Sequence, residues 1–156
     1  YRFSKTYNPK LEYGNVGSAL QEAGIEKPTP QQLRDTIIRI RQAKLPDPKV
    51  LGNAGSFFMN PVVSTHKYNQ LAQQYVGMPH YTIDSEYEKI PAGWLIEQCG
   101  WKGKALGKAA VHNKQALVLV NCGGATGSEV VQLYKTIQHD VKQKFDIEIK
   151  PEVNIC

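Results

Sequence analysis

The feature that most constrains this sequence is a stretch rich in proline and glycine, K-L-P-D-P-K-V-L-G-N-A-G-S-F-F-M-N-P, at residues 44–61. Two prolines restrict the backbone where the stretch begins. Gly52 and Gly55 then allow a positive φ or a close approach of the backbone, at little cost in energy. Ser56 follows immediately and precedes two phenylalanines. A regular helix cannot run through this stretch, so it must divide the chain into segments on either side.

The same stretch carries three polar groups, the ammonium of Lys44, the hydroxyl of Ser56 and the amide of Asn60. Polar groups on a short, stiffened span are typical of a functional site, although a Gly-Asn-Ala-Gly run is most often only a turn. The stretch lacks the second glycine of a nucleophile elbow and has no histidine beside Ser56, which disfavours serine hydrolase chemistry. It matches neither a phosphate loop nor a dinucleotide-binding turn. The pattern alone therefore indicates a glycine loop suited to anions, and leaves open whether it is a site or a turn.

The chain has 156 residues and a formal net charge of +5, with a pI near 9.1. This length is sufficient for one domain with its own core. The positive charge suits a ligand that carries phosphates or carboxylates. Lysine and arginine are spread through every segment rather than clustered with aromatic residues, so a nucleic-acid binder is the weakest of the alternatives. Such a binder would show steeply salt-dependent binding to duplex DNA.

Cys99, Cys122 and Cys156 are widely separated and form no C-x-x-C pair. A disulfide framework is therefore not expected, and a reducing compartment, the cytoplasm, is the expected location. The four histidines lack the spacing of metal ligands, so no metal is expected. No apolar run is long enough to span a membrane, and no signal peptide opens the chain. Because the chain begins with tyrosine rather than methionine, we expect it to be a fragment.

Capping residues and apolar periodicity predict four helices. They are expected from Thr29-Pro30 to about Lys44, from a cap at Ser64 to about Tyr75, from Pro91 to Gly100, and from a cap at Thr126 or Ser128 to about Phe145. Short extended segments are expected at residues 1–6, 10–13, 56–59, 107–112, 116–121 and 147–149. A loop is expected from residue 13 to Pro28. Helices and strands do not alternate as in βαβ units, so the predicted class is an α+β fold in a single compact domain.

Four blocks of the sequence then resemble one family in the family's own order. They are G-N-A-G-S-F-F-M-N-P, P-A-G-W-L-I-E-Q-C-G-W-K-G, A-A-V-H-N-K-Q-A-L-V-L-V-N and K-P-E-V, and together they span nearly the whole chain. The chain is similar to UDP-N-acetylenolpyruvoylglucosamine reductase, the MurB flavoenzyme family. The resemblance implies that the full-length protein reduces UDP-N-acetylglucosamine enolpyruvate to UDP-N-acetylmuramate, with FAD and NADPH, in peptidoglycan synthesis. Cell-wall biogenesis, cell shape and cell division are the processes that this activity serves.

The resemblance also implies roles for individual residues. Ser56 matches the family's serine that protonates the substrate carbon after hydride arrives, which suits a hydroxyl that keeps its proton near pH 7. Glu152 matches a carboxylate that helps to stabilise or protonate the enol form of the substrate carboxylate. These two residues are distant in sequence, so the resemblance requires the fold to bring them to one cavity.

Four further positions match the family's substrate-binding residues, namely Lys44, Asn60, Gln115 and Tyr13. An ammonium paired with a diphosphate makes charge-assisted hydrogen bonds, which suits Lys44. Tyr13 lies in the L-E-Y-G segment and matches a tyrosine on a loop over the diphosphate in the longer form of the family. The UDP-sugar is thus the expected partner of a monomeric protein, without nucleic acid or membrane.

The chain departs from the family pattern in two ways. We expect the family's N-terminal region, which holds FAD and a catalytic arginine in a Tyr-Arg context, to be missing from this chain, and Arg2 is too close to Tyr13 to be that arginine. Asn154 stands where the family often has arginine. We therefore expect residues 1–28 to be the end of the flavin-side region, residues 29–150 the substrate-binding domain, and residues 151–156 a return segment.

From this comparison we expect no FAD-binding residue in the chain, and the terminal strands to have belonged to the flavin-binding region. The chain alone should be inactive. The alternative function is a non-catalytic module that binds UDP-sugars or other diphosphates.

Overall fold

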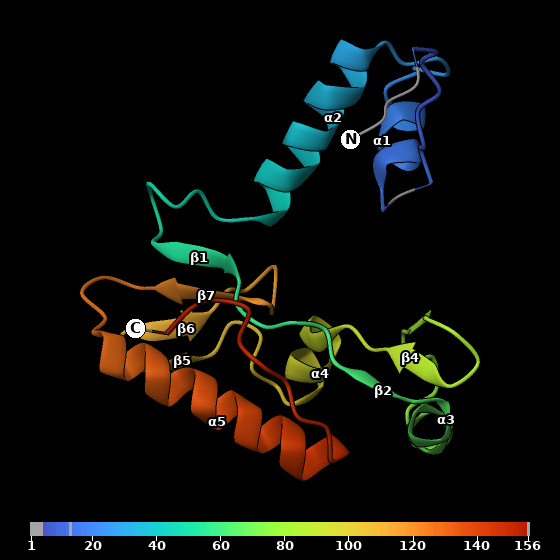
Figure 1. Cartoon of the computed structure of the whole chain (residues 1–156). Helices are drawn as coiled ribbons and strands as arrows, with labels where there is room; N and C mark the ends of the chain where they lie inside the picture. The colour runs from blue at the N-terminus through green and yellow to red at the C-terminus, as the bar shows by residue number, and fades with distance from the viewer. Residues whose placement is uncertain (1–4, 13, 156) are drawn as a thin grey trace. The chain divides into compact units, whose positions relative to one another are not determined.

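The computed structural model describes residues 5–12 and 14–155. The chain forms two compact units, residues 1–45 and 46–156. The first contains α1 (Val16–Glu22) and α2 (Pro30–Lys44). The second contains two small antiparallel sheets and three helices (Figure 1). This mixture of helices and antiparallel sheets confirms the α+β class. The three functional segments expected from the sequence remain predictions.

The predicted loop from residue 13 to Pro28 is wrong in part, because it contains α1. The side chain of its N-cap residue, Asn15, makes no capping hydrogen bond, in contrast to Thr29 at the start of α2. Its Val16 and Leu20 are 8% and 1% exposed, and the helix contacts α2. Packing of this apolar pair, rather than a local signal, therefore stabilises the helix.

The helix α2 begins as the sequence predicts. Thr29 accepts a hydrogen bond from the Gln32 amide, and the Gln32 side chain accepts one from the Thr29 amide, which completes a capping box. The helix ends at Lys44, before the two prolines. The extended segments expected at residues 1–6 and 10–13 fall partly outside the described residues, and residues 5–12 form no strand.

The larger sheet of the second unit has the strand order β1-β7-β6-β5. Its strands are β1 (Asn53–Ser56), β7 (Val118–Asn121), β6 (Ala109–Val111) and β5 (Ala105–Leu106). The long helix α5 (Gly127–Phe145) lies along this sheet (Figure 1), and its residues Leu133, Ile137 and Val141 are fully buried. Thr126 caps α5 by accepting from the Glu129 amide, which is one of the two caps that the sequence allowed. The sheet and α5 together enclose most of the core.

The smaller sheet has the order β2-β4-β3, with β2 (Val62–Ser64), β4 (Tyr87–Lys89) and β3 (Tyr81–Thr82). The helix α3 (Thr65–Gln74) packs against it, and the Ser64 side chain caps α3 by accepting from the Lys67 amide. The short helix α4 (Ala92–Gln98) follows β4 and begins after Pro91. The predicted helices at these positions are confirmed.

Two of the predicted strands differ from the structure. The strand expected at residues 56–59 is found three residues earlier, as β1. Beyond β1, Phe58 forms an isolated antiparallel bridge to Pro151. Residues 147–149 form no strand, although Ile147 and Ile149 are buried. The carbonyl of Ile149 accepts instead from the Gln138 side chain at 2.7 Å. The apolar alternation of residues 147–149 thus indicates correctly that Ile147 and Ile149 are buried. However, the Ile149 carbonyl accepts its hydrogen bond from a side chain and not from a neighbouring strand.

Candidate functional site

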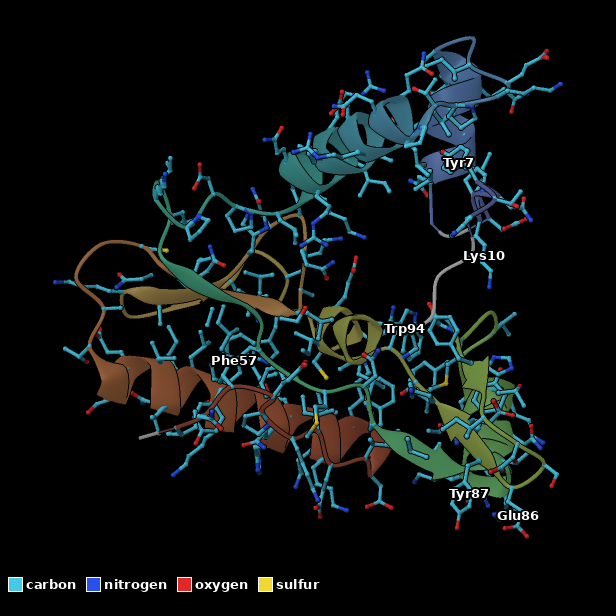
Figure 2. The ribbon with its side chains drawn as sticks, turned by 45° about the horizontal axis from the view of Figure 1, so that its top comes forward. Tyr7, Lys10, Phe57, Glu86, Tyr87 and Trp94 are labelled. Carbon is cyan, nitrogen blue, oxygen red and sulfur yellow. The ribbon has the colours of Figure 1, made fainter. Side chains whose placement is uncertain are left out.

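Ser56 ends β1 and is anchored by the residue that follows it. The Phe57 amide donates to the Leu117 carbonyl at 2.7 Å, and Ser56 stands opposite Val118 of β7. Phe57 is 5% exposed, and its ring lies 5.4 Å from that of Tyr134 on α5, inside the molecule (Figure 2). Ser56 itself is exposed. The buried aromatic side chain fixes the backbone, and the hydroxyl remains free to meet a ligand.

The C-terminal segment that carries Glu152 runs antiparallel beside the residues after Ser56. The Glu152 amide donates to the Phe57 carbonyl at 2.8 Å, and the Met59 amide donates to the Lys150 carbonyl at 2.9 Å. Glu152 is exposed, as Ser56 is. The backbone therefore brings the two predicted catalytic positions together, because Glu152 is hydrogen-bonded to the residue next to Ser56.

Asn60 and Gln115 meet at the start of α4. The Asn60 Oδ1 accepts from the Ala92 amide at 2.9 Å. The Gln115 Oε1 accepts from the Leu117 amide at 3.3 Å, and it lies where a Cβ on Gly93 would approach within 3.5 Å. Each side-chain oxygen thus accepts a hydrogen bond from a backbone amide. Two amide donors near one helix start suit a ligand rich in oxygen acceptors.

A hollow of about 740 Å³ lies next to the segments that carry Ser56 and Glu152. It lies between Ala54 and Phe57 of the glycine segment, the first turns of α5, and residues 153–155 of the C-terminal segment. Its walls include Val130, Val131 and Val153, and Asn154 contributes a polar edge. Because the wall is mostly apolar, this hollow suits packing better than it suits a diphosphate.

The comparisons with known proteins show the family of this chain. Residues 47–156, more than half of the chain, match the family model described as the C-terminal domain of UDP-N-acetylenolpyruvoylglucosamine reductase. The chain belongs to the UDP-N-acetylenolpyruvoylglucosamine reductase family. Its membership confirms the resemblance on which the site residues were chosen.

Several reductases of this family are close relatives. The chain is 53% identical over 155 residues to the reductase of Bacteroides fragilis, an alignment that covers 99% of this chain and 46% of the relative. It is 52% identical over 153 residues to that of Porphyromonas gingivalis, covering 98% and 45%, and 49% identical over 154 residues to that of Burkholderia vietnamiensis, covering 97% and 44%. The chain thus spans a little under half the length of the relatives it matches.

The other two predicted substrate-binding residues, Lys44 and Tyr13, do not belong to the described part of the second unit. Lys44 is the exposed last residue of α2 and belongs to the first unit, whereas Ser56, Asn60 and Gln115 belong to the second. Tyr13 lies outside the described residues, as does Arg2. Their predicted roles therefore stay predictions.

Sequence reasoning missed the role of Gly93. A Cβ at this position would lie 3.3 Å from the Leu117 Cγ and 3.5 Å from the Gln115 Oε1. Glycine therefore lets α4 approach the segment that carries Gln115. The P-A-G-W run in the sequence marks a helix start, but only the tertiary contact explains why its third residue is glycine.

Two further titratable groups, Cys99 and His112, have shifted pKa values. Burial raises the pKa of the Cys99 thiol above its ordinary value, which keeps it protonated near neutral pH. Burial, and then the neighbouring Lys114 ammonium, lower the pKa of His112. Across residues 5–12 and 14–155, no three side chains of histidine, cysteine, aspartate or glutamate gather as a metal site would require. In the same part of the chain, no helix is long and apolar enough to cross a membrane.

Proposed function

We propose that this chain is the substrate-binding part of an FAD- and NADPH-dependent reductase that converts UDP-N-acetylglucosamine enolpyruvate to UDP-N-acetylmuramate in the cytoplasm. Besides family membership, one observation in the structure supports the proposal. The hydrogen bond from the Glu152 amide to the Phe57 carbonyl supports it, because it brings the backbone of residue 152 next to the residue that follows Ser56, and both Ser56 and Glu152 are exposed. An exposed carboxylate and an exposed hydroxyl on adjacent backbone segments suit a reaction in which another part of the protein supplies the hydride.

The expected cofactor, FAD, is compatible with this arrangement if another part of the full-length protein holds it. The relatives are about twice as long as this chain, and the exposed positions of Ser56 and Glu152 leave room for a second body to approach. We assign no FAD-binding residue to the chain and expect that group in the remaining half of the protein. FAD, reduced by NADPH, supplies the hydride, so the chain alone should be inactive.

The chemistry left to this chain is the transfer of one proton and the binding of the substrate. Reduction of the enolpyruvyl double bond adds a hydride to one carbon and a proton to the other. The Ser56 hydroxyl donates that proton, and its fixed backbone provides the alignment that proton transfer needs. Glu152 stabilises or protonates the enol form of the substrate carboxylate. The serine recovers its proton from solvent, so atoms and charge balance over the cycle.

The binding roles follow from the donors available. The NH₂ groups of Asn60 and Gln115 meet oxygen acceptors of the UDP-sugar, since their carbonyl oxygens are already bonded. Lys44 pairs with the diphosphate, and Tyr13 covers it. The protein acts as a monomer on a small anionic substrate, without nucleic acid or membrane.

The test uses the full-length protein and separates the two half-reactions. We expect Ser56→Ala to leave reduction of the flavin by NADPH unchanged and to slow its reoxidation by the UDP-sugar by about 10²- to 10⁴-fold, the range for loss of a general acid. Stopped-flow absorbance of the flavin measures both rates. Ser85→Ala, on the exposed turn before β4, is the control and should change neither. Equal losses in both half-reactions would contradict the role of Ser56.

The binding-module alternative makes a different prediction for the same protein. A full-length preparation that binds the UDP-sugar in calorimetry but shows no flavin absorbance, even after added FAD, would favour it. With the chain alone, appreciable turnover of FAD and NADPH would overturn the claim that this part lacks the hydride chemistry.

A further inference from the structure

The side chain of Asn53 ties together the glycine loop that leads to Ser56. Its Nδ2 donates to the Leu51 carbonyl at 2.8 Å and to the Pro46 carbonyl at 3.3 Å. Its Oδ1 accepts from the Gly55 amide at 3.0 Å. One half-buried amide thus joins the proline turn at the start of the loop to the residue just before Ser56.

The same residues also form β1, in which Asn53 pairs with Val120 and Ser56 pairs with Val118 of β7. The register between β1 and β7 is irregular between Asn53 and Ser56, and on the β7 side the Asn121 amide donates to the Gly52 carbonyl at 2.8 Å. Gly55 has a φ of 75°, and a Cβ built on it would meet no atom within 4 Å. Packing therefore does not hold Gly55 in its left-handed conformation. Between the two paired residues, the hydrogen bond from the Gly55 amide to the Asn53 Oδ1 restrains this irregular part of β1.

We infer that Asn53 is a positioning residue for Ser56. This inference rests on the proposed function, because it concerns the proton that Ser56 donates. Buried Phe57 fixes Ser56 from the C-terminal side, and Asn53, acting through Gly55, fixes it from the N-terminal side. Both donor hydrogens of the Asn53 amide and its oxygen are engaged by its own loop, so the residue has no role in holding the substrate. Proton transfer depends steeply on alignment, and a displacement of about 1 Å can cost about 100-fold in rate.

The first test is Asn53→Asp in the full-length holoenzyme. The aspartate has the same shape and keeps the acceptor for the Gly55 amide. It loses both donors, and it places a carboxylate against two carbonyl oxygens. We expect reoxidation of the flavin by the UDP-sugar to slow by about 10- to 100-fold, while KM for the UDP-sugar changes less than about 3-fold and reduction by NADPH is unchanged. The solvent deuterium isotope effect on reoxidation should rise, because the misaligned proton transfer limits the rate.

A double-mutant comparison separates this inference from the proposed function. In a Ser56→Ala background, Asn53→Asp should cause no further loss, since its effect acts through the serine. The positioning role of Asn53 would be wrong if Asn53→Asp slowed reoxidation as much in the Ser56→Ala background as in the wild type. It would also be wrong if Asn53→Asp slowed reduction by NADPH and reoxidation by the UDP-sugar equally. If Ser56→Ala itself leaves reoxidation unchanged, the proposed function fails instead, so the two failures are distinguishable.

A second variant keeps the inference testable if Asn53→Asp does not fold. Gly55→Ala places a Cβ in open space but disfavours the left-handed φ. It should reproduce the same pattern, with slower reoxidation, little change in KM and an increased isotope effect. Gly77→Ala, at a φ of 76° and likewise without neighbours within 4 Å, is its matched control. If both glycine variants behave alike in reoxidation, the role assigned to the loop is wrong.

Discussion

Each of the two sheets of residues 46–156 has a glutamate in or beside it, and the two carboxylates have different hydrogen-bond partners. Beside the four-stranded sheet, the Glu129 carboxylate accepts from the Lys108 amide at 3.2 Å and from the Thr126 amide at 2.8 Å. On β4 of the three-stranded sheet, Glu88 is 5% exposed and accepts from the Thr82 hydroxyl at 3.3 Å. Its Oε2 has no hydrogen-bond partner among the described residues, and the His80 Nε2 is 4.0 Å away.

The sheets also differ in how they are covered. All of β6 is buried beneath α5 or its neighbours. The small sheet instead exposes one face, on which Val62 is 51%, Tyr81 64% and Tyr87 45% exposed. Figure 2 shows Tyr87 pointing outward beside Glu86. The larger sheet also carries Ser56, on its exposed edge strand β1, so the predicted proton donor lies at the open edge of a sheet whose central strands β6 and β7 are packed in the core.

The largest expected effect on the free energy of unfolding comes from replacing one buried side chain next to each sheet by alanine. Ile137→Ala, at a fully buried position on α5, should lower the free energy of unfolding by about 3–5 kcal/mol. Leu71→Ala, at a 6% exposed position on α3, should cost about 2–3 kcal/mol, because the partly open small sheet can collapse around the vacancy. Urea denaturation of both variants measures the difference. Equal losses of unfolding free energy in the two variants would contradict the conclusion that the larger sheet is the better packed of the two.

A smaller effect of opposite sign is expected at Glu88. Glu88→Leu should raise the free energy of unfolding by about 1 kcal/mol, because it removes a buried carboxylate oxygen that lacks a partner. Glu86→Leu, on the exposed turn beside it, is the control and should change stability by less than about 0.5 kcal/mol. A clear loss of stability in Glu88→Leu would show that the carboxylate is better satisfied than its contacts indicate.

The smallest effect concerns the pH dependence of Glu129. Hydrogen bonds from the Thr126 and Lys108 amides lower the pKa of its carboxyl below that of an ordinary glutamate. The stability this adds is therefore present above the ordinary pKa and is lost as the pH falls through the lowered value. Glu129→Gln should be less stable than the wild type near pH 7 and should converge with it in acid. Thermal unfolding at pH 7 and pH 3 checks this, and a gap that persists in acid would contradict it.

The helices with side-chain caps were predictable from local sequence. Thr29, Ser64 and Thr126 each cap the helix expected after them. In contrast, α1 has no such cap and was missed, because its stability comes from the burial of Val16 and Leu20. The strand expected at residues 147–149 was wrong for a related reason. Apolar alternation indicates which side chains are buried, but it does not say which partner takes the backbone hydrogen bonds.

The site was only partly predictable. Ser56 and Glu152 were chosen because their motifs resemble one family, and nothing in their spacing indicated that their backbones would meet. The orientation of Asn60 and Gln115, with their oxygens bonded to amides, could not be read from residue type. Asn53 was visible in the sequence only as part of a turn pattern, although its amide proves to hold that turn together.

The sequence by itself determined the caps, the break in regular structure at residues 44–61 and, through its motifs, the family. These depend on bonds and backbone preferences within a few residues, which local sequence encodes. Only the tertiary structure decided that the C-terminal segment lies beside Phe57 and that Asn60 and Gln115 face α4. Such pairings depend on how apolar surfaces from distant segments fit against one another, and no short stretch of the chain contains that information.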